Sequence, residues 1–401
     1  MTPLRILQVT PYYEHAWGYG GIPRVATSIS RGLAKRGHHV TVCTTDACDA
    51  NSRVNDAQTR AEGAVKVLSF PNVSNQVAYR FQFFTPQGML AFLLRHASEF
   101  DIAHLHGFHH LPGVIAAAAL ARAQVPYLVA PNGVAGRMER RIFAKWLFDV
   151  TLGSRVLPQA AGAIAVSEAE RGQLVELGVP ADKIYVVPNP IDLAEFDPPP
   201  QKPSSSLHQR FGGRFEQIVL YLGTLTPRKS VDVLVRALGK LREQSIGLMI
   251  AGNDLGSGAG LRALVQRLGL TDQVKFAGQL VGRQRLEMLA SADAVAYAGR
   301  AEIFGLVPLE AILSGTPVVV ASDSGCGQVI DRVGGGLLVP PDDANALARA
   351  LSNVLASPAT WRETISQAQP RVRELYSSEV VAAAMEEVYL RIVKPRTQVA
   401  R

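Results

Sequence analysis

The stretch that decides the fold is AEIFGLVPLEAILSGTPVVVASD, from Ala301 to Asp323. It predicts a loop that follows a strand, then a helix, and then the buried strand PVVVAS, at the distance that a βαβ unit requires. Glu302 lies in the loop, and Glu310 is predicted in the first turn of the helix. Gly305, just before the helix, lets the backbone approach a ligand closely, and the helix start offers free N–H groups to an anion.

The residues around this stretch repeat the same alternation of strands and helices. Helices are predicted from Ser230 and near Leu261 and Leu286. The predicted strands are QIVLYLGT from Gln217, SIGLMIAG from Ser245, QVKFAGQ from Gln273, AVAYAG from Ala294 and PVVVASD from Pro317. Strands that alternate with helices indicate a parallel sheet, so we expect a doubly wound domain over 216–375.

The first half of the chain has the same organisation. Its clearest helix has Pro23 in the first turn and Gly37 just beyond the end, with apolar residues at helical spacing between them. The predicted strands are LRILQVT from Leu4, HHVTVCTT from His38, VKVLSF from Val65, DIAHLHG from Asp101, PYLVAPNG from Pro126, AGAIAVSE from Ala161 and KIYVVPNP from Lys183. A first Rossmann-like domain is therefore expected over 1–195.

The composition changes between the two halves. FDPPPQKPSSSLHQRFGG, from Phe196, is rich in Pro, Ser and Gly and predicts a linker over 196–215. An amphipathic helix is expected within 376–401, where it packs back on the first domain. The predicted fold class is α/β, with two doubly wound domains that face each other across a cleft and bind ligands at the carboxyl ends of their strands.

Length and charge exclude several classes of protein. The chain has 401 residues, and 41 Lys plus Arg against 34 Asp plus Glu give a net charge of +7. No block of like charges is long enough for a nucleic-acid arm, so we expect no nucleic-acid partner. Three cysteines are too few for a disulfide framework or a zinc site. The N-terminus lacks the pattern of a signal peptide, and the apolar run from Leu111 is about half of a membrane span. We therefore expect a cytoplasmic protein.

Several motifs together resemble retaining glycosyltransferases of family 4, which have the GT-B fold. The segment Ala301–Asp323 is similar to the donor-binding signature of that family. By itself, the pair Glu302 and Glu310 is a weak signal and fits two surface carboxylates better than a binding site. The segment YLGTLTPRKSVDVLVRAL from Tyr221 is similar to the glycine turn of the family, and Arg228 and Lys229 match its basic pair.

The resemblance extends over nearly all of the chain. Many family members have Arg where this chain has Thr224, which puts one phosphate contact in doubt. GYGGIPRVATSISRGLAKRGHHVTV, from Gly18, resembles the family's Gly-rich loop, in which Gly20 and Gly21 approach the diphosphate or acceptor. DIAHLHG matches the family's strand-end histidine at His106, although a histidine there also fits a purely structural role. We expect His104 to face the opposite side of that strand.

Two further segments complete the resemblance. VSEAERGQLVELGVPADKIYVVPNPIDLAEF, from Val166, is similar to the segment that ends the first domain, and VKFAGQL, from Val274, resembles the strand and loop beside the nucleotide base. The second of these assigns Gly278 to donor binding. Whether the base is uridine or guanosine is not readable from residue types.

The resemblance implies a retaining transfer of a hexosyl unit from a UDP- or GDP-sugar to an acceptor hydroxyl. Glu310 would bind the ribose and Glu302 the transferred sugar. Arg228, Lys229 and the backbone around Phe304, Gly305 and Leu306 would stabilise the leaving diphosphate. His106 would position the sugar or acceptor. The residues expected to be catalytic are therefore His106, Arg228, Lys229 and Glu302.

No metal or cofactor is expected beside the nucleotide sugar. No Asp-x-Asp triplet follows a strand, which indicates that Arg, Lys and helix ends meet the phosphate charge. His109 and His110 have no carboxylate or cysteine nearby to complete a metal site. GYGG is not GxGxxG, so a nicotinamide site has little support.

The acceptor is less well defined by the sequence. The segment 136–157 mixes Arg137, Arg140, Arg141 and Lys145 with large apolar residues, a pattern that fits either a basic helix on an anionic membrane or a helix packed on its own domain. A saccharide or lipid-linked saccharide acceptor in bacterial envelope polysaccharide or glycolipid synthesis is consistent with the first interpretation. Two alternatives stay open: a nucleotide-sugar epimerase or hydrolase, and a non-catalytic nucleotide-sugar binding protein.

Overall fold

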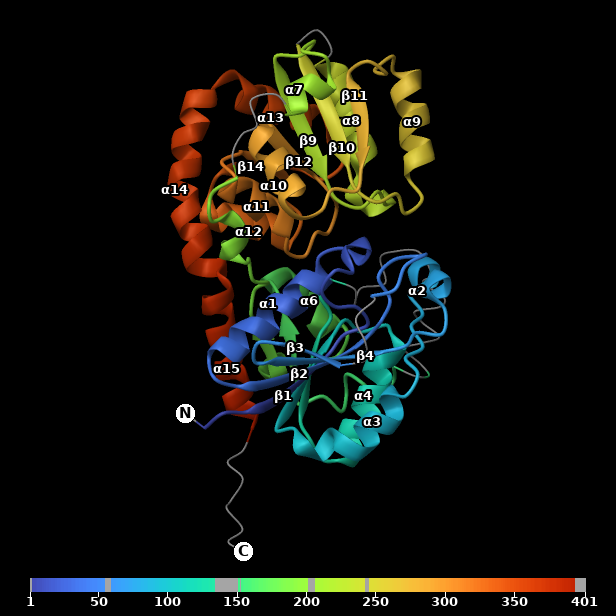
Figure 1. The fold of residues 1–401 in the computed structure, drawn as a ribbon. Helices are drawn as coiled ribbons and strands as arrows, with labels where there is room; N and C mark the ends of the chain where they lie inside the picture. The colour runs from blue at the N-terminus through green and yellow to red at the C-terminus, as the bar shows by residue number, and fades with distance from the viewer. Residues whose placement is uncertain are drawn as a thin grey trace, which may run out of the picture. The chain divides into compact units, whose positions relative to one another are not determined.

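The computed structural model describes residues 2–54, 59–133, 151, 153–200, 206–241 and 245–393. The chain divides into two compact units, coloured by residue number in Figure 1. Unit 1 comprises Met1–Pro190 and Ser378–Arg401, and unit 2 comprises Ile191–Ser377. The last helix of the chain therefore belongs to the unit in which the chain begins.

Unit 1 is built on a sheet that, in the described residues, has eight strands in the order β3-β4-β2-β1-β5-β6-β7-β8. The pairs are parallel except for β3 with β4. The central strands are almost entirely buried, as strands covered by helices on both faces must be. The strands are β1 Arg5–Val9, β2 His39–Thr45, β3 Thr59–Glu62, β4 Val65–Phe70, β5 Ile102–His106, β6 Tyr127–Ala130, β7 Gly162–Ala165 and β8 Ile184–Val186.

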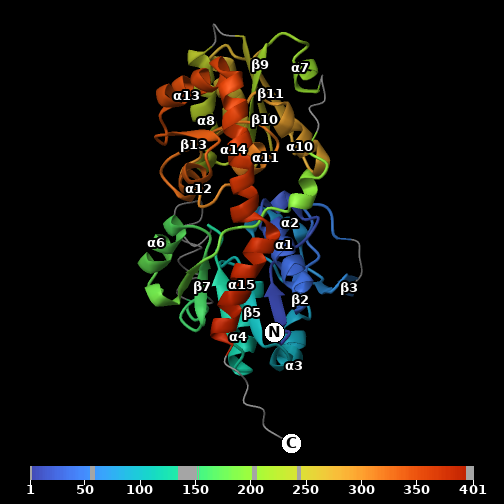
Figure 2. The same cartoon turned by 90° about the vertical axis from the view of Figure 1, so that its left-hand side faces the viewer.

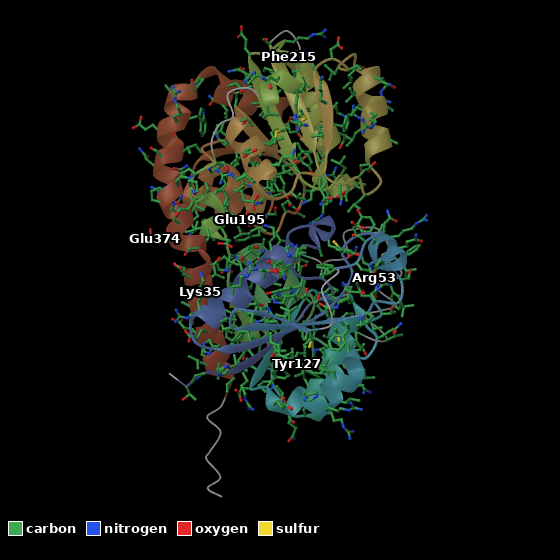
Figure 3. The ribbon with its side chains drawn as sticks, viewed as in Figure 1. Lys35, Arg53, Tyr127, Glu195, Phe215 and Glu374 are labelled. Carbon is green, nitrogen blue, oxygen red and sulfur yellow. The ribbon has the colours of Figure 1, made fainter. Side chains whose placement is uncertain are left out.

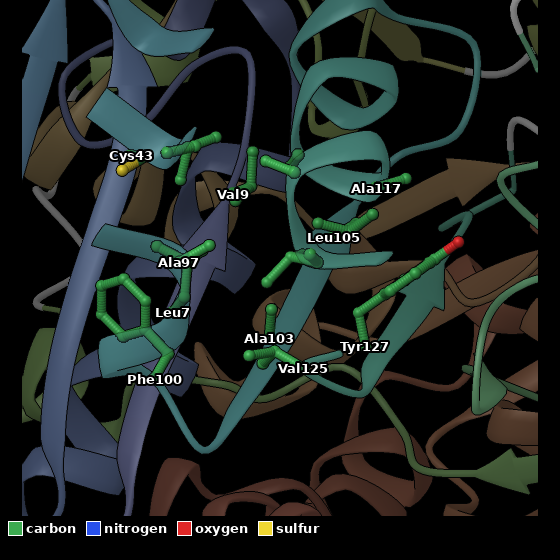
Figure 4. Packing of buried hydrophobic residues seen from close by; sticks show 14 of the residues in the cluster. Leu7, Val9, Cys43, Ala97, Phe100, Ala103, Leu105, Ala117, Val125 and Tyr127 are labelled. Atoms are coloured by element: carbon green, nitrogen blue, oxygen red, sulfur yellow. The ribbon is translucent and has the colours of Figure 1, made fainter. Parts of the chain in front are cut away.

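The helices of unit 1 bury apolar residues against this sheet. Figure 4 shows part of the core on one face, where Leu7, Leu105 and Tyr127 of three strands pack with Ala97 and Phe100. The helices are α1 Ile22–Lys35, α2 Asn75–Phe81, α3 Met89–His96, α4 Leu111–Arg122, α6 Glu168–Glu176 and α15 Ser378–Ile392, with 3-10 turns η1 Trp17–Tyr19, η2 Ala97–Glu99 and η3 Ala181–Lys183.

Helix α15 packs beside α1, although almost the whole chain separates them (Figure 2). Glu386 of α15 accepts a hydrogen bond from Arg36 Nε at 2.7 Å and lies 2.8 Å from His38 Nε2. Gly32 of α1 has no room for a side chain, because a Cβ there would lie 3.1 Å from the carbonyl oxygen of Ser378 and still closer to Ala382. A partly buried ion pair and a close helix contact thus hold α15 on unit 1.

Unit 2 has a second doubly wound sheet. In the described residues its six strands are parallel, in the order β11-β10-β9-β12-β13-β14. They are β9 Gln217–Leu222, β10 Ile246–Ala251, β11 Val274–Gly278, β12 Ala294–Tyr297, β13 Val318–Ala321 and β14 Gly336–Val339. The helices are α7 Ser206–Arg210, α8 Val231–Lys240, α9 Gly258–Arg267, α10 Gly282–Ser291, α11 Leu306–Leu313, α12 Gly325–Val333, α13 Ala344–Ala356 and α14 Pro358–Tyr376, with 3-10 turns η4 Leu193–Phe196 and η5 Pro227–Lys229.

The predicted fold class and all the predicted strands are confirmed, but the sequence missed two strands. TRAE of β3 contains no apolar run, and it is the edge strand that pairs antiparallel. GLLV of β14 comes directly after Gly334 and Gly335, and consecutive glycines indicate a loop. The strand itself is only partly buried. Both missed strands lie at sheet edges, where periodicity is weakest.

The predicted linker is not an exposed connection. Phe196, Leu207 and Phe211 lie within 196–215 and are buried in unit 2, because this segment supplies apolar side chains to that unit. The chain passes between the units at Pro190 and again at Ser377. Around these two points, the backbone N–H of Ile191 donates to the carbonyl of Tyr376 at 2.7 Å.

Candidate active site

In unit 2, the predicted site lies where the strand order reverses. The chain runs from β9 outward through β10 to β11, then returns to β12 on the other side of β9. In open α/β sheets, ligands bind at the carboxyl edge of the sheet beside such a reversal. Arg228 and Lys229 follow β9 in η5, and Glu302 follows β12.

These three side chains meet although 73 residues separate Lys229 from Glu302. Lys229 Nζ lies 2.5 Å from Glu302 Oε2, and Arg228 Nη1 lies 3.4 Å from Glu302 Oε1. The backbone fixes the two loops together, because the N–H of Arg300 donates to the carbonyl of Arg228 at 2.9 Å. One carboxylate with two cations leaves a net positive charge, which suits an anionic ligand.

The environment keeps Glu302 ionised. Burial would by itself raise the pKa of this carboxyl, but the charges of Lys229 and Arg228 and the hydrogen bonds from Lys229 and Tyr297 lower the pKa to about 2. Glu302 is only 6% exposed. It is therefore a fixed hydrogen-bond acceptor and not a general acid at neutral pH.

Tyr297, the last residue of β12, is a member of the site that the sequence analysis missed. Its hydroxyl lies 3.0 Å from Lys229 Nζ and 2.5 Å from Glu302 Oε2. Because an ammonium group can only donate, the hydroxyl accepts from Lys229 and donates to Glu302. The lysine also lies over the tyrosine ring, 5.1 Å from its centroid. Its position at the end of a predicted strand, where ligand-binding residues of open α/β sheets gather, was the available signal.

The start of α11 is shaped by Gly305. This residue has φ of 82°, in the left-handed region that favours glycine, and a Cβ there would contact Cys326 Sγ. Phe304 before it is buried, and Leu306 after it begins the helix. The N–H of Cys326 donates to the carbonyl of Glu302 at 2.7 Å, and this hydrogen bond fixes the loop before α11. Helix α11 thus begins at Leu306, four residues after Glu302.

Glu310 is placed differently from the prediction. It is the fifth residue of α11 and so lies in the second turn, not the first. It is fully buried, and its Oε1 lies 2.5 Å from Arg285 Nη1, an ionic contact without the alignment of a hydrogen bond. Arg285 was not predicted as a site residue, since a charged residue in an amphipathic helix normally indicates an exposed face.

The two remaining predicted donor residues also lie at strand ends. Thr224 follows β9, and its carbonyl accepts from the Tyr221 hydroxyl at 2.9 Å. Gly278 ends β11, two strands from β9, with φ of 71° and open space where a Cβ would lie. Thr224 belongs to the same loop as Arg228, whereas Gly278 stands further along the sheet edge.

In unit 1, the predicted residues surround the equivalent reversal between β1 and β5. Gly20 has φ of 96°, and Gly21 precedes the first turn of α1. His106 ends β5. Its ring is fully buried, and its Nε2 lies 2.6 Å from Gln8 Oε1. In this structure the side chain of His106 therefore contacts protein and not solvent.

The expectation that His104 faces away from His106 was wrong. Residues two apart in a strand point to the same face, and the two imidazole rings stack with centroids 4.2 Å apart. His104 Nδ1 lies 2.7 Å from the hydroxyl of Tyr389, which in turn accepts from Gln8 Nε2 at 3.2 Å. His106, Gln8, Tyr389 and His104 thus form one buried hydrogen-bonded series that ties β1 and β5 to α15.

Three predictions concern metal binding and membranes. Within the described ranges, no group of three or more His, Cys, Asp or Glu side chains is placed to hold a metal ion. In the same ranges, no helix is both long and apolar enough to cross a membrane. Most of the predicted basic helix 136–157 lies outside the described residues.

Two doubly wound units, with a cationic cluster at the strand reversal of the second, are the architecture of GT-B glycosyltransferases, and the comparisons with known proteins give the same class. The chain matches the description "Glycosyltransferase Family 4" over residues 19–195 and "Glycosyl transferases group 1" over residues 210–371. A D-inositol 3-phosphate glycosyltransferase of Xylanimonas cellulosilytica is 30% identical over 94% of this chain and 93% of its own length. The chain belongs to glycosyltransferase family 4.

Solved structures share the fold. Sucrose-phosphate synthase from Thermosynechococcus elongatus superimposes with a TM-score of 0.75 at 24% identity, covering 97% of this chain and 99% of that one. Anabaena HepE in complex with UDP-glucose gives a TM-score of 0.74 at 22% identity, covering 97% of this chain and all of its own. Both support two α/β units of the GT-B type.

Proposed function

We propose that this glycosyltransferase moves a hexosyl unit from a UDP- or GDP-sugar to a hydroxyl of a saccharide or lipid-linked saccharide, with retention of the anomeric configuration. The observation that carries the proposal is the cluster of Arg228, Lys229 and Glu302, which has a net positive charge and lies at the strand reversal of unit 2. The complex of HepE with UDP-glucose supports a nucleoside diphosphate sugar as the donor class.

The donor contacts follow from the chemistry of each side chain. Arg228, Lys229 and the N–H groups of Gly305 and Leu306 bind the diphosphate, whose charge grows as the sugar leaves. Glu302 has a low pKa and stays an acceptor, so it binds hydroxyls of the transferred sugar. Glu310 accepts hydrogen bonds from the ribose.

The reaction requires no protein nucleophile. The acceptor oxygen forms a bond to the anomeric carbon on the face from which the diphosphate oxygen departs, and the acceptor proton passes to that departing oxygen. Fixed cations lower the barrier because their contact with the diphosphate is strongest when the bond is nearly broken. In this proposal Arg228 and Lys229 supply the positive charge, and no metal ion takes part.

The acceptor is assigned to unit 1, through the Gly-rich loop at Gly20 and Gly21. Its setting in the proposal is bacterial envelope polysaccharide or glycolipid synthesis, with peripheral attachment to an anionic membrane surface through 136–157. A second candidate acceptor is a small phosphorylated polyol. The name of the Xylanimonas relative, a D-inositol 3-phosphate glycosyltransferase, favours that alternative.

A thermal-shift screen tests the donor. UDP, GDP, ADP and NAD are added to the purified protein with and without EDTA, and a nucleoside diphosphate that binds raises Tm. Stabilisation by UDP or GDP that is insensitive to EDTA is expected. Stabilisation by NAD alone, or by none of the four, would sink the proposal. With the donor known, NMR of the product with candidate acceptors decides between retention and inversion, and incubation without acceptor detects a hydrolase.

A further inference from the structure

Arg285 connects two separate segments of unit 2. Its side chain in α10 is nearly buried, and its Nη1 lies 2.5 Å from Glu310 Oε1 of α11. On the other edge of the guanidinium, Nη2 donates to Glu195 Oε2 of η4, the residue labelled in Figure 3. One arginine is therefore shared between the first turn of unit 2 and the helix that carries Glu310.

The two carboxylates differ in their exposure. Glu310 is fully buried, whereas the Glu195 side chain is 31% exposed. A buried carboxylate needs a paired cation to stay ionised, and Arg285 supplies that charge at Glu310. Two carboxylates against one guanidinium leave a net negative charge, which favours hydrogen-bond donors such as hydroxyl groups.

We propose that Arg285 is a positioning residue for the nucleotide: it holds the Glu310 carboxylate ionised and oriented to receive the ribose hydroxyls, while Glu195 holds Arg285. The inference rests on the proposed function, because it takes Glu310 as the ribose ligand. Arginine suits this role because its planar fork presents separate edges to two carboxylates, which the single ammonium group of lysine does not.

The position of the ribose decides which kinetic constant changes. The inference treats the ribose contacts as uniform binding, equally strong before and during the reaction. Loss of such a contact raises KM for the donor and leaves kcat nearly unchanged. A purely structural role for Arg285 would lower the amount of folded protein and would produce no selective change in KM.

The test compares R285M and R285K with the matched control R283M. Arg283 lies two residues earlier in α10, and its half-exposed side chain contacts Glu287 at 3.7 Å. Isothermal titration with UDP and GDP gives Kd, and initial rates give KM and kcat. R285M is expected to weaken nucleotide binding roughly tenfold, R285K by an intermediate factor, and R283M by less than about twofold.

A double-mutant cycle shows whether Arg285 acts through Glu310. R285M should have little further effect on Kd when E310Q is already present, because the carboxylate that it positions is gone. Equal effects of R285M in both backgrounds would overturn the inference. So would a folded R285M protein with wild-type Kd, or one that loses kcat alone.

A second variant covers the case in which R285M does not fold. E195A keeps the contact between Arg285 and Glu310 and removes the other anchor, so a smaller rise in Kd is expected, and an unchanged Kd would contradict the inference. Wild-type protein that binds neither UDP nor GDP would refute the proposed function and this inference with it. Wild-type binding that R285M leaves unchanged would refute this inference alone.

Discussion

Lys229 and Glu302 are in direct contact, Nζ to Oε2 at 2.5 Å, although they follow different strands of unit 2. The contact exists because β9 and β12 are neighbours in the sheet, so the loops at their carboxyl ends begin side by side. The pair combines a carboxylate, which accepts hydrogen bonds, with an ammonium group, which donates them; in the proposed function these bind sugar hydroxyls and phosphate oxygens. The two roles are separable by substitution.

Lys229→Ala should lower turnover more than it lowers donor affinity. Arg228 still neutralises Glu302 in this variant, so the cluster survives, but one cation facing the leaving diphosphate is lost. A loss of about 100-fold in kcat is expected, the effect of removing one preorganised donor to a developing charge. Initial rates and nucleotide titration measure the two constants. A change in KM alone would show that Lys229 binds the ground state and has no larger role in the transition state.

Tyr297→Phe removes the hydroxyl that links Lys229 to Glu302 and keeps the ring. The free energy of unfolding should fall by about 1–3 kcal/mol, since both polar partners lose a buried contact, and kcat should fall because Lys229 is less well oriented. Tyr221→Phe is the matched control, because its ring stacks on Tyr297 and its hydroxyl donates to the carbonyl of Thr224. Equal losses of kcat in the two variants would remove the special role of Tyr297.

Gly305→Ala tests the start of α11. The left-handed backbone alone costs about 1–2 kcal/mol for an alanine, and the new methyl also contacts Cys326 Sγ. Gly315→Ala isolates the first effect, because Gly315 has φ of 89° with nothing within 4 Å of its Cβ position. We expect Gly305→Ala to lower Tm more than Gly315→Ala does, as measured by differential scanning calorimetry. We also expect it to weaken nucleotide binding, as measured by isothermal titration. If Cys326→Ala fails to improve the Gly305→Ala protein, the clash is not the cause.

The sequence predicted where the site residues lie along the chain but not which of them meet. Glu302 was predicted in a loop after a strand, and Arg228 and Lys229 were predicted at the start of the helix near Ser230. These assignments needed only local periodicity and the family resemblance. That β9 pairs with β12 is a property of strand order, which no local pattern contains. Tyr297 was missed because a tyrosine that ends an apolar strand has the pattern of a core residue.

Buried charged residues were the second feature that the sequence did not predict. Arg285 stands among polar residues in an amphipathic helix, and Glu195 lies in the segment that ends the first predicted domain, next to the predicted linker. Only their tertiary partners show that the first is buried and the second anchors it. Gln8 and Tyr389, 381 residues apart, are a similar case, because their hydrogen bond depends on α15 returning to unit 1.

Unit 1 should lose stability when the pH falls below about 6.5, the ordinary pKa of histidine. Burial lowers the pKa of His106 to about 3 and of His110 to about 4, and that of His104 well below its usual value. The unfolded chain then binds protons that the folded one does not, so each histidine removes about 1.4 kcal/mol per pH unit below 6.5 until its folded pKa is reached. Burial raises the pKa of Glu170 to about 6, which offsets part of the loss between pH 6 and 4.5.

His110→Asn separates this titration from packing. His110 caps α4, where its Nδ1 accepts from the Gly113 N–H at 3.0 Å, and asparagine caps a helix in the same way without titrating near neutral pH. Calorimetry between pH 7.5 and 5 should show a fall in Tm for the wild-type protein and a shallower fall for His110→Asn. His39→Gln, at an exposed position, should keep the wild-type slope. If Tm rises as the pH falls, or if all three proteins have one slope, the buried histidines do not set the acid stability of unit 1.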